Sequence, residues 1–183
     1  LMRWLVPLLC IVAASASAAE VSFTTWLVPW EQTRPRDPDV HPDGGVWFVG
    51  QVGDYVARLD PASGDLRRRD LPEGTGPHNC IVGAEGDVWI AGNRAGWIGR
   101  LDPEAESLET VAMPGGVEDP HTLIQAPDGT IWFTAQWSNR IGRLDPATGA
   151  TRTWEVPVDH ARPYGIVLDG SHQPWVALLG TNA

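Results

Sequence analysis

The sequence predicts an all-β fold, a β-propeller of four-stranded blades, and two observations lead to this prediction. Turn-forming residues are abundant, with 20 glycines and 16 prolines in 183 residues, and they separate short runs rich in aromatic and β-branched residues. The chain also repeats itself, because four tryptophans recur 42, 43 and 43 residues apart, at Trp47, Trp89, Trp132 and Trp175. A strand-rich repeat of about 40–45 residues is typical of a propeller blade.

The first segment, residues 1–19, has the pattern of a signal peptide. Arg3 provides a positive charge, residues 4–14 are apolar but too few to span a bilayer, and residues 16–18 fit the small-x-small cleavage pattern. A buried N-terminal helix is the alternative interpretation. We therefore expect an exported protein, periplasmic or secreted, with no membrane span after cleavage and with Cys80 as its one remaining cysteine.

The next segment, residues 21–29, is expected to form an outer strand. Trp26 and Pro29 recur 128 residues later as Trp154 and Pro157, which lie in the expected outer strand of a blade. In a closed ring, an outer strand at the start of the chain completes the last blade and covers its open edge.

The blades themselves follow from markers that keep one period. A proline stands 12 residues before each repeated tryptophan, at Pro35, Pro77, Pro120 and Pro163. In the third copy we expect strands over 122–126, 130–135, 140–145 and 150–157. Within a domain spanning 20–183, the expected blades are 36–77, 78–120, 121–163 and a partial fourth at 164–183. We therefore expect a truncated part of a propeller with three full blades and part of a fourth; a stable half-propeller is the alternative.

Composition excludes several classes of function. The chain has 13 basic and 23 acidic residues and a net charge of −10, which argues against a nucleic-acid partner. No P-loop, nucleotide-binding glycine pattern, serine-nucleophile elbow or zinc-type Cys/His spacing is present. We expect a monomer in which the four repeated tryptophans fill the space between blades. Trp97 and Trp137 lie in or beside loops between second and third strands and are candidates to flank a binding mouth.

The residues that follow each repeat proline are the candidates for a functional site. The first strand of each blade lines the channel of a propeller, so four pairs stand together at its mouth: Arg36-Asp37, His78-Asn79, His121-Thr122 and Tyr164-Gly165. Proline fixes its own φ, which gives the next residue a defined direction. A histidine here can act as a general base, and Asp119 can hold a divalent cation through oxygen. The alternative is that these polar residues only solvate the channel mouth.

Several motifs together resemble the virginiamycin B lyase (streptogramin lyase) family: Pro-His, Asp-Gly-x-[Ile/Val]-Trp-Phe-Thr, Asn-Arg-Ile-Gly-Arg-Leu-Asp-Pro-x-Thr-Gly and x-Val-Pro. The resemblance covers residues 21–183 and implies a seven-bladed, Mg²⁺-dependent enzyme, linked to antibiotic resistance, that opens a cyclic depsipeptide at its ester by elimination. It also implies that His78 and His121 are catalytic and that Asp119 replaces a glutamate near Mg²⁺. A second family glutamate has no counterpart, because Ala135 and Gln136 stand there, which leaves Gln136 as an oxygen ligand.

On this resemblance, Mg²⁺ would polarise an ester carbonyl, His121 would remove the adjacent carbon-bound proton, and the carboxylate would leave. The implied partner is a small-molecule or cyclic peptide substrate, and the candidates for binding it are Arg36, Asn79, Tyr164 and Trp137. Two other functions stay open. One is a non-catalytic exported propeller that binds a ligand or protein at the channel mouth. The other is a lactone hydrolase of the gluconolactonase-like group, which would need a cluster of acidic and amide metal ligands that the sequence does not display.

Overall fold

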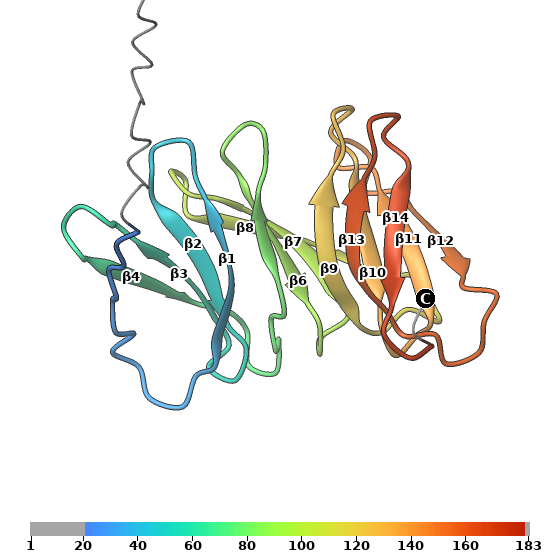
Figure 1. The fold of residues 1–183 in the computed structure, drawn as a ribbon, viewed down its shortest axis with the longest axis horizontal. Coiled ribbons are helices and arrows are strands. Elements are labelled where there is room, and N and C mark those ends of the chain that lie inside the picture. The colour runs from blue at the N-terminus through green and yellow to red at the C-terminus, as the bar shows by residue number, and fades with distance from the viewer. Residues whose placement is uncertain (1–20, 182–183) are drawn as a thin grey trace, which may run out of the picture.

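A computed structural model describes residues 21–181 of the chain. In this part the regular structure consists of fourteen β-strands, which form four antiparallel sheets arranged side by side as a fan (Figure 1). The expected signal peptide, residues 1–19, lies outside the described residues. Nothing in residues 21–181 forms a helix of the length and apolarity needed to cross a membrane.

Each sheet follows chain order from its inner to its outer strand, as the blade prediction requires. The first sheet holds β1 (Pro35–Val40), β2 (Val46–Gly50), β3 (Tyr55–Leu59) and β4 (Leu66–Asp70). The second holds β5 (Cys80–Val82), β6 (Val88–Gly92), β7 (Trp97–Asp102) and β8 (Ser107–Ala112). The third holds β9 (Pro120–Gln125), β10 (Ile131–Ala135), β11 (Arg140–Leu144) and β12 (Thr151–Glu155), and the fourth pairs β13 (Pro163–Leu168) with β14 (Pro174–Leu178). The prediction of an all-β partial propeller is confirmed.

The hairpin between the third and fourth strands forms through the predicted aspartate turn. Asp60 Oδ1 accepts a hydrogen bond from the Ala62 amide at 2.8 Å, and Asp145 Oδ1 accepts the corresponding bond from Ala147 at 2.9 Å. The turn glycine two positions further on has a positive φ, 70° at Gly149, which residues with a Cβ rarely adopt. The sequence therefore specifies this hairpin locally.

The repeated tryptophans pack between sheets only in the first half of the molecule. Trp47 is 8% exposed and lies in one cluster with Leu101 of β7, while Trp89 is 3% exposed and clusters with residues of the third sheet. Trp132 is half-buried and stacks on Trp154, with 5.6 Å between ring centroids, and Trp175 is 64% exposed. Trp132 lacks the full contact because the fourth sheet has no described strand corresponding to β7, and Trp175 is exposed because no described sheet follows the fourth.

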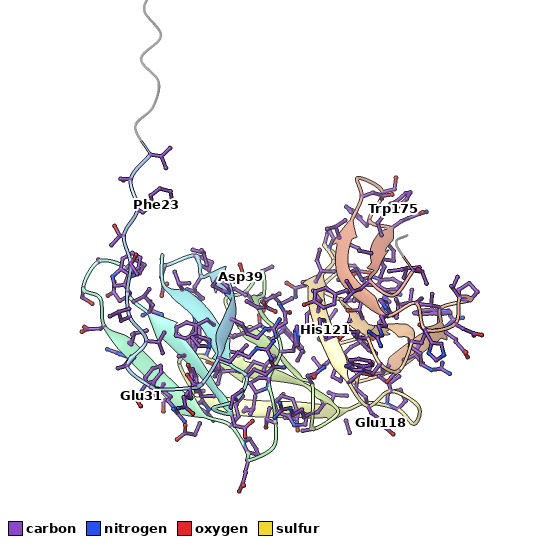
Figure 2. All side chains as sticks on the ribbon, turned by 60° about the horizontal axis from the view of Figure 1, so that its bottom comes forward. Phe23, Glu31, Asp39, Glu118, His121 and Trp175 are labelled. Atoms are coloured by element: carbon purple, nitrogen blue, oxygen red, sulfur yellow. The ribbon has the colours of Figure 1, made fainter. Side chains whose placement is uncertain are left out.

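The expected outer strand at residues 21–29 is not formed in the structure. The partner that this strand requires, the third strand of a last blade, is not among the described strands. Instead, Val28 and the following Trp30 pack against the first sheet, on a cluster that includes Phe48 and Tyr55. Phe23 projects from this segment and is 91% exposed (Figure 2).

Candidate functional site

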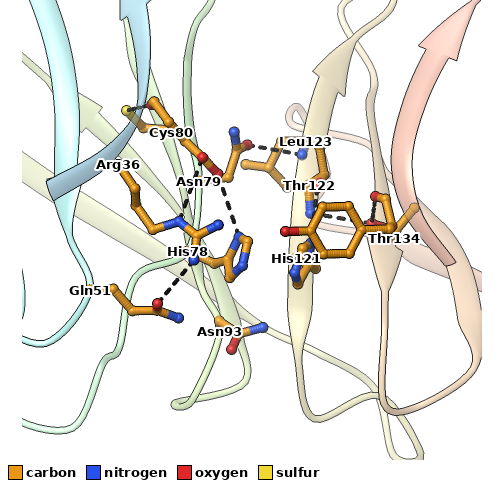
Figure 3. Close-up of polar contacts among 12 residues, drawn as sticks. Arg36, Gln51, His78, Asn79, Cys80, Asn93, His121, Thr122, Leu123 and Thr134 are labelled. Atoms are coloured by element: carbon orange, nitrogen blue, oxygen red, sulfur yellow. Dashed lines mark hydrogen bonds and ion pairs between the residues drawn. The ribbon is translucent and has the colours of Figure 1, made fainter. Parts of the chain in front are cut away.

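Four side chains meet near the beginnings of the inner strands: Asp37 in β1, His78 just before β5, His121 in β9 and Tyr164 in β13. His78 and His121 face each other with 3.4 Å between ring centroids and a tilt of 36° (Figure 3). The Tyr164 ring lies 4.4 Å from that of His121, again between centroids. On the other side, Asp37 Oδ2 lies 3.5 Å from His78 Nδ1. The repeat positions therefore meet in space as the sequence predicts.

A β-bulge after the repeat proline aims these side chains into the site. In β9, Pro120 pairs with Ala135 and Leu123 with Phe133, so two residues, His121 and Thr122, stand opposite one. The fourth sheet has the same shift between Pro163 and Ile166. A bulge bends the strand and redirects side chains that would otherwise alternate between the faces of the sheet. The motif of proline followed by a bulge thus explains why His121 and Tyr164 point toward their neighbours.

The first sheet differs because its register shift lies one residue later. Arg36 still pairs with Val49, and the shift falls between Arg36 and Asp39. Pro38 stands within this shift and has no amide hydrogen to donate to the ladder. Asp37 adopts a positive φ of 48° and turns its carboxylate toward His78. Arg36 instead donates from Nη1 to Gln51 Oε1 at 3.0 Å, so it lies beside the histidines with its guanidinium partly engaged.

Both histidines are buried, and burial favours the neutral form of each ring. His121 is 2% exposed, and burial together with the neighbouring His78 lowers the pKa of His121 to about 3. Burial also lowers the pKa of His78, while the contact with Asp37 opposes the shift. Two imidazolium rings in contact would repel each other in a poorly solvated site. We conclude that both rings are neutral at pH 7.

In each of the two rings, the Nε2 atom is available to a ligand. His121 Nδ1 lies 2.9 Å from Thr122 Oγ1, and His78 Nδ1 faces Asp37. Neither Nε2 atom has a hydrogen-bond partner within residues 21–181, and neither is among the fully buried unpaired atoms. Neutral imidazoles with accessible Nε2 atoms can accept protons or bind a ligand through hydrogen bonds.

No hydrogen bond or ion pair joins Asp119 to either histidine in the described residues, and its carboxylate binds the β10–β11 turn. Its Oδ2 accepts a bond from the Trp137 amide at 2.6 Å, and its Oδ1 accepts one from the Ser138 amide at 2.9 Å. The Ser138 hydroxyl also donates to Oδ1. The carboxylate is buried and caps the β10–β11 turn, so both of its oxygens are already bound by protein donors.

The expected magnesium ligands are therefore not assembled in the described residues. Gln136 lies partly buried in the β10–β11 turn and forms no side-chain hydrogen bond in this part of the chain. Across residues 21–181, no three His, Cys, Asp or Glu side chains converge in a way that could hold a metal ion. Magnesium prefers several oxygen ligands in octahedral geometry, and a histidine pair beside one aspartate does not match that preference.

Two of the candidate binding residues have different surroundings. Asn79 is buried, and its Oδ1 accepts a bond from the Leu123 amide at 3.0 Å, so it ties the second sheet to the third. Trp137 is 67% exposed, with the Arg162 guanidinium 4.3 Å from its ring centroid. Trp137 lines an open cavity of about 550 Å³ that also includes Asn93. Asn93 donates to the Pro120 carbonyl at 3.1 Å, which places this cavity next to the histidine site.

Sequence reasoning missed one member of the site. Asp37 belongs to the predicted ring, yet Arg36 was the residue expected to act there. The available signal was Pro38, which is absent at the corresponding position of the other three blades. A second proline three residues after the first indicates a shifted bulge, and hence a different side chain at the mouth.

Comparisons with known proteins agree with the fold and the motifs. The model of the virginiamycin B lyase family matches residues 15–183. The chain is similar to a solved streptogramin B lyase, with 28% identity and a TM-score of 0.81, covering 88% of this chain and 53% of that one. It is similar to virginiamycin B lyase from Staphylococcus aureus, with 25% identity and a TM-score of 0.79, covering 86% and 53%.

A third similar structure is a catalytically inactive variant of the Staphylococcus aureus enzyme with quinupristin, with 25% identity and a TM-score of 0.78. The match covers 85% of this chain and 52% of that structure. The chain thus spans about half the length of these structures. Among curated protein sequences, none matches the chain.

Proposed function

The chain belongs to the virginiamycin B lyase family, and we propose that it carries part of the active site of a carbon–oxygen lyase that opens a cyclic ester by elimination. The observation that supports this proposal is the pair of neutral imidazoles, His78 and His121, in contact at the inner end of adjacent sheets. A neutral ring with an accessible nitrogen is the group that proton abstraction requires.

In the proposed reaction His121 Nε2 takes a proton from the carbon next to a carbonyl. The electron pair of that C–H bond forms a carbon–carbon double bond, the carbon–oxygen bond breaks, and the carboxylate leaves within the opened ring. Negative charge develops on the substrate beside the ring and stabilises the imidazolium that forms. This stabilisation is needed because a pKa of about 3 makes His121 a weak base before substrate binds. The proton then passes to solvent.

No step of this proposal runs through Mg²⁺, because the residues present do not fit its site. Both oxygens of Asp119 are held by the β10–β11 turn, and Ala135 occupies the place of the second family glutamate. Tyr164 stands over the His121 ring and is positioned to orient substrate. Trp137 offers an exposed aromatic face at the adjacent cavity, which suits an apolar part of a cyclic peptide.

A second candidate function rests on the position of Asp119. If the carboxylate next to the Pro-His motif is a structural cap, the mouth can bind a ligand or protein without converting it. Both functions suit an exported protein, and we place the protein in the periplasm or outside the cell on the signal-like pattern of residues 1–19. Both also suit a monomer with a small-molecule or cyclic peptide ligand.

Liquid chromatography with tandem mass spectrometry of a streptogramin B depsipeptide incubated with the whole protein tests the proposal, because the ring-opened isomer and the cyclic substrate differ in retention and fragmentation. Elimination opens the ring without changing the mass, whereas hydrolysis adds one water. We expect an opened product of unchanged mass, and we expect His121→Ala to abolish it. His172→Asn is the matched control, because His172 is exposed in the β13–β14 turn and asparagine tolerates its positive φ of 62°.

Intact substrate after incubation with and without Mg²⁺ would reject this lyase activity. Calorimetric binding of the same depsipeptide, without conversion, would then support the second candidate.

A further inference from the structure

We propose that Asp37 is a positioning residue of the site, which selects the His78 tautomer with the proton on Nδ1 and leaves Nε2 free to accept a hydrogen bond or proton. The inference concerns the same site as the proposed function and depends on that function only for its catalytic consequence. Four features support it: the backbone at Asp37, its contacts, the charges around His78, and the contrast with Asp39.

The backbone at Asp37 differs from that at every equivalent position. Asp37, Asn79, Thr122 and Gly165 each stand two residues after a repeat proline, and among them only Asp37 has a positive φ, at 48°. Residues with a Cβ rarely adopt this conformation, and it persists where surrounding structure imposes it. Here the bulge at Asp37 and Pro38 imposes it and turns the carboxylate toward the neighbouring sheet.

The contact between Asp37 and His78 favours one tautomer of the His78 ring. Asp37 Oδ2 lies 3.5 Å from His78 Nδ1, a distance of ion-pair length that is not aligned as a hydrogen bond. His78 Nδ1 is fully buried and has no other partner within residues 21–181. A lone pair on Nδ1 would face the carboxylate and repel it, whereas an N–H there is attracted to it. The site therefore favours the Nδ1–H tautomer.

Tautomer choice matters because the surrounding charges keep His78 neutral. Arg36 and Arg34 are cations near the ring. Burial opposes an imidazolium most strongly, the two arginine charges oppose it further, and the Asp37 carboxylate favours it. A neutral ring carries a single proton, so fixing that proton on Nδ1 determines that Nε2 is the acceptor.

Asp39 provides a matched control on the same strand. Its Oδ2 accepts a hydrogen bond from the Val82 amide at 2.7 Å, so it also reaches the second sheet, and its Oδ1 accepts one from the Val40 amide at 2.8 Å. No contact joins Asp39 to either histidine in the described residues. Asp39→Asn thus removes a carboxylate from β1 without touching the His78 ring.

The test is nitrogen NMR of histidine side chains in the whole protein at pH 7, with ¹⁵N-labelled histidine. We expect a protonated Nδ1 and an unprotonated Nε2 for His78 in the wild type. Asp37→Asn should reverse this, because an amide group can donate to Nδ1, and asparagine tolerates the positive φ. Asp39→Asn should leave the His78 signals unchanged.

An Nε2–H tautomer or an imidazolium for His78 in the wild type would overturn the inference, even if no variant folds. The same tautomer in wild type and Asp37→Asn would also overturn it. This readout needs no substrate, so it stands apart from the lyase proposal. If the protein opens the depsipeptide, Asp37→Asn should lower kcat by about tenfold or more with little change in KM, and the control should not.

Discussion

Two aspartates lie near the two histidines, and the structure uses them differently. Asp119 directly precedes the second Pro-His motif, yet its buried carboxylate binds the backbone of Trp137 and Ser138. Asp37 lies 41 residues before His78 in the chain, yet its carboxylate faces the His78 ring at 3.5 Å. Proximity in the sequence therefore does not decide which carboxylate reaches the histidine site. The direction of the backbone at each aspartate decides whether its carboxylate reaches the site.

Loss of the Asp119 carboxylate should have the largest effect on stability. Asp119→Ala removes three hydrogen bonds to the β10–β11 turn and leaves two backbone amides without their acceptor, which should lower the free energy of unfolding by about 2–4 kcal/mol. Guanidinium denaturation measures this. Glu118→Ala is the control, because Glu118 is exposed, and its effect should stay within about 0.5 kcal/mol. Equal effects of the two variants would show that the Asp119 carboxylate does not stabilise the β10–β11 turn as a cap.

The histidine pair should make stability depend on pH. The pKa of His121 falls from 6.5 to about 3 in the folded protein, so the unfolded chain binds the additional proton between these values. The stabilising contribution is present above pH 6.5 and is lost as the pH falls toward 3, with a slope of at most about 1.4 kcal/mol per pH unit for one proton. His121→Gln should flatten the fall in unfolding free energy between pH 7 and pH 5. A parallel fall in the variant would show that His121 is not buried as a neutral ring.

Replacing Asp37 should leave stability nearly unchanged, in contrast to Asp119. Asp37→Gly relieves the positive φ of 48° but removes two contacts of 3.5 Å, with Arg36 and His78. These opposing contributions should keep the unfolding free energy within about 1 kcal/mol of the wild type. Thermal unfolding followed by circular dichroism measures the change. A loss as large as that of Asp119→Ala would mean that Asp37 is a structural residue.

The smallest effect on stability is expected at Trp137. Its ring is 67% exposed and touches mainly the Arg162 guanidinium, so Trp137→Ala should change the unfolding free energy by less than about 0.5 kcal/mol. If the adjacent cavity binds substrate, the same variant should raise KM more than it changes kcat. Unchanged binding of the depsipeptide by calorimetry would exclude Trp137 from the binding surface.

The sequence predicted the parts of the fold that depend on local pattern. The period of the tryptophans and prolines placed the four sheets, and the aspartate turn at Asp60 and Asp145 formed as expected. The repeat also predicted that His78 and His121 would meet, because equivalent positions of neighbouring blades converge at the channel end of the inner strands. These features can be predicted from short-range sequence rules and from the geometry of a repeat.

The rest depended on contacts that a linear pattern does not encode. The role of Asp119 as a cap arises from two turn amides, 18 and 19 residues further along the chain, that point at the carboxylate. The role of Asp37 arises from a one-residue change of register in a single strand. The outer strand expected at 21–29 required a pairing partner that is absent from the described strands, so residues of that segment pack on a sheet face instead.

Calorimetric titration of Mg²⁺ into the wild-type protein and into Asp119→Asn tests the claim on which the contrast between the two aspartates depends. The claim is that Asp119 caps a turn, and that the carboxylate of the histidine site is Asp37. We predict the same Mg²⁺ isotherm for both proteins, once circular dichroism shows that both are folded. Mg²⁺ binding in the wild type that disappears in the folded Asp119→Asn variant would contradict this account and would return Asp119 to the metal site.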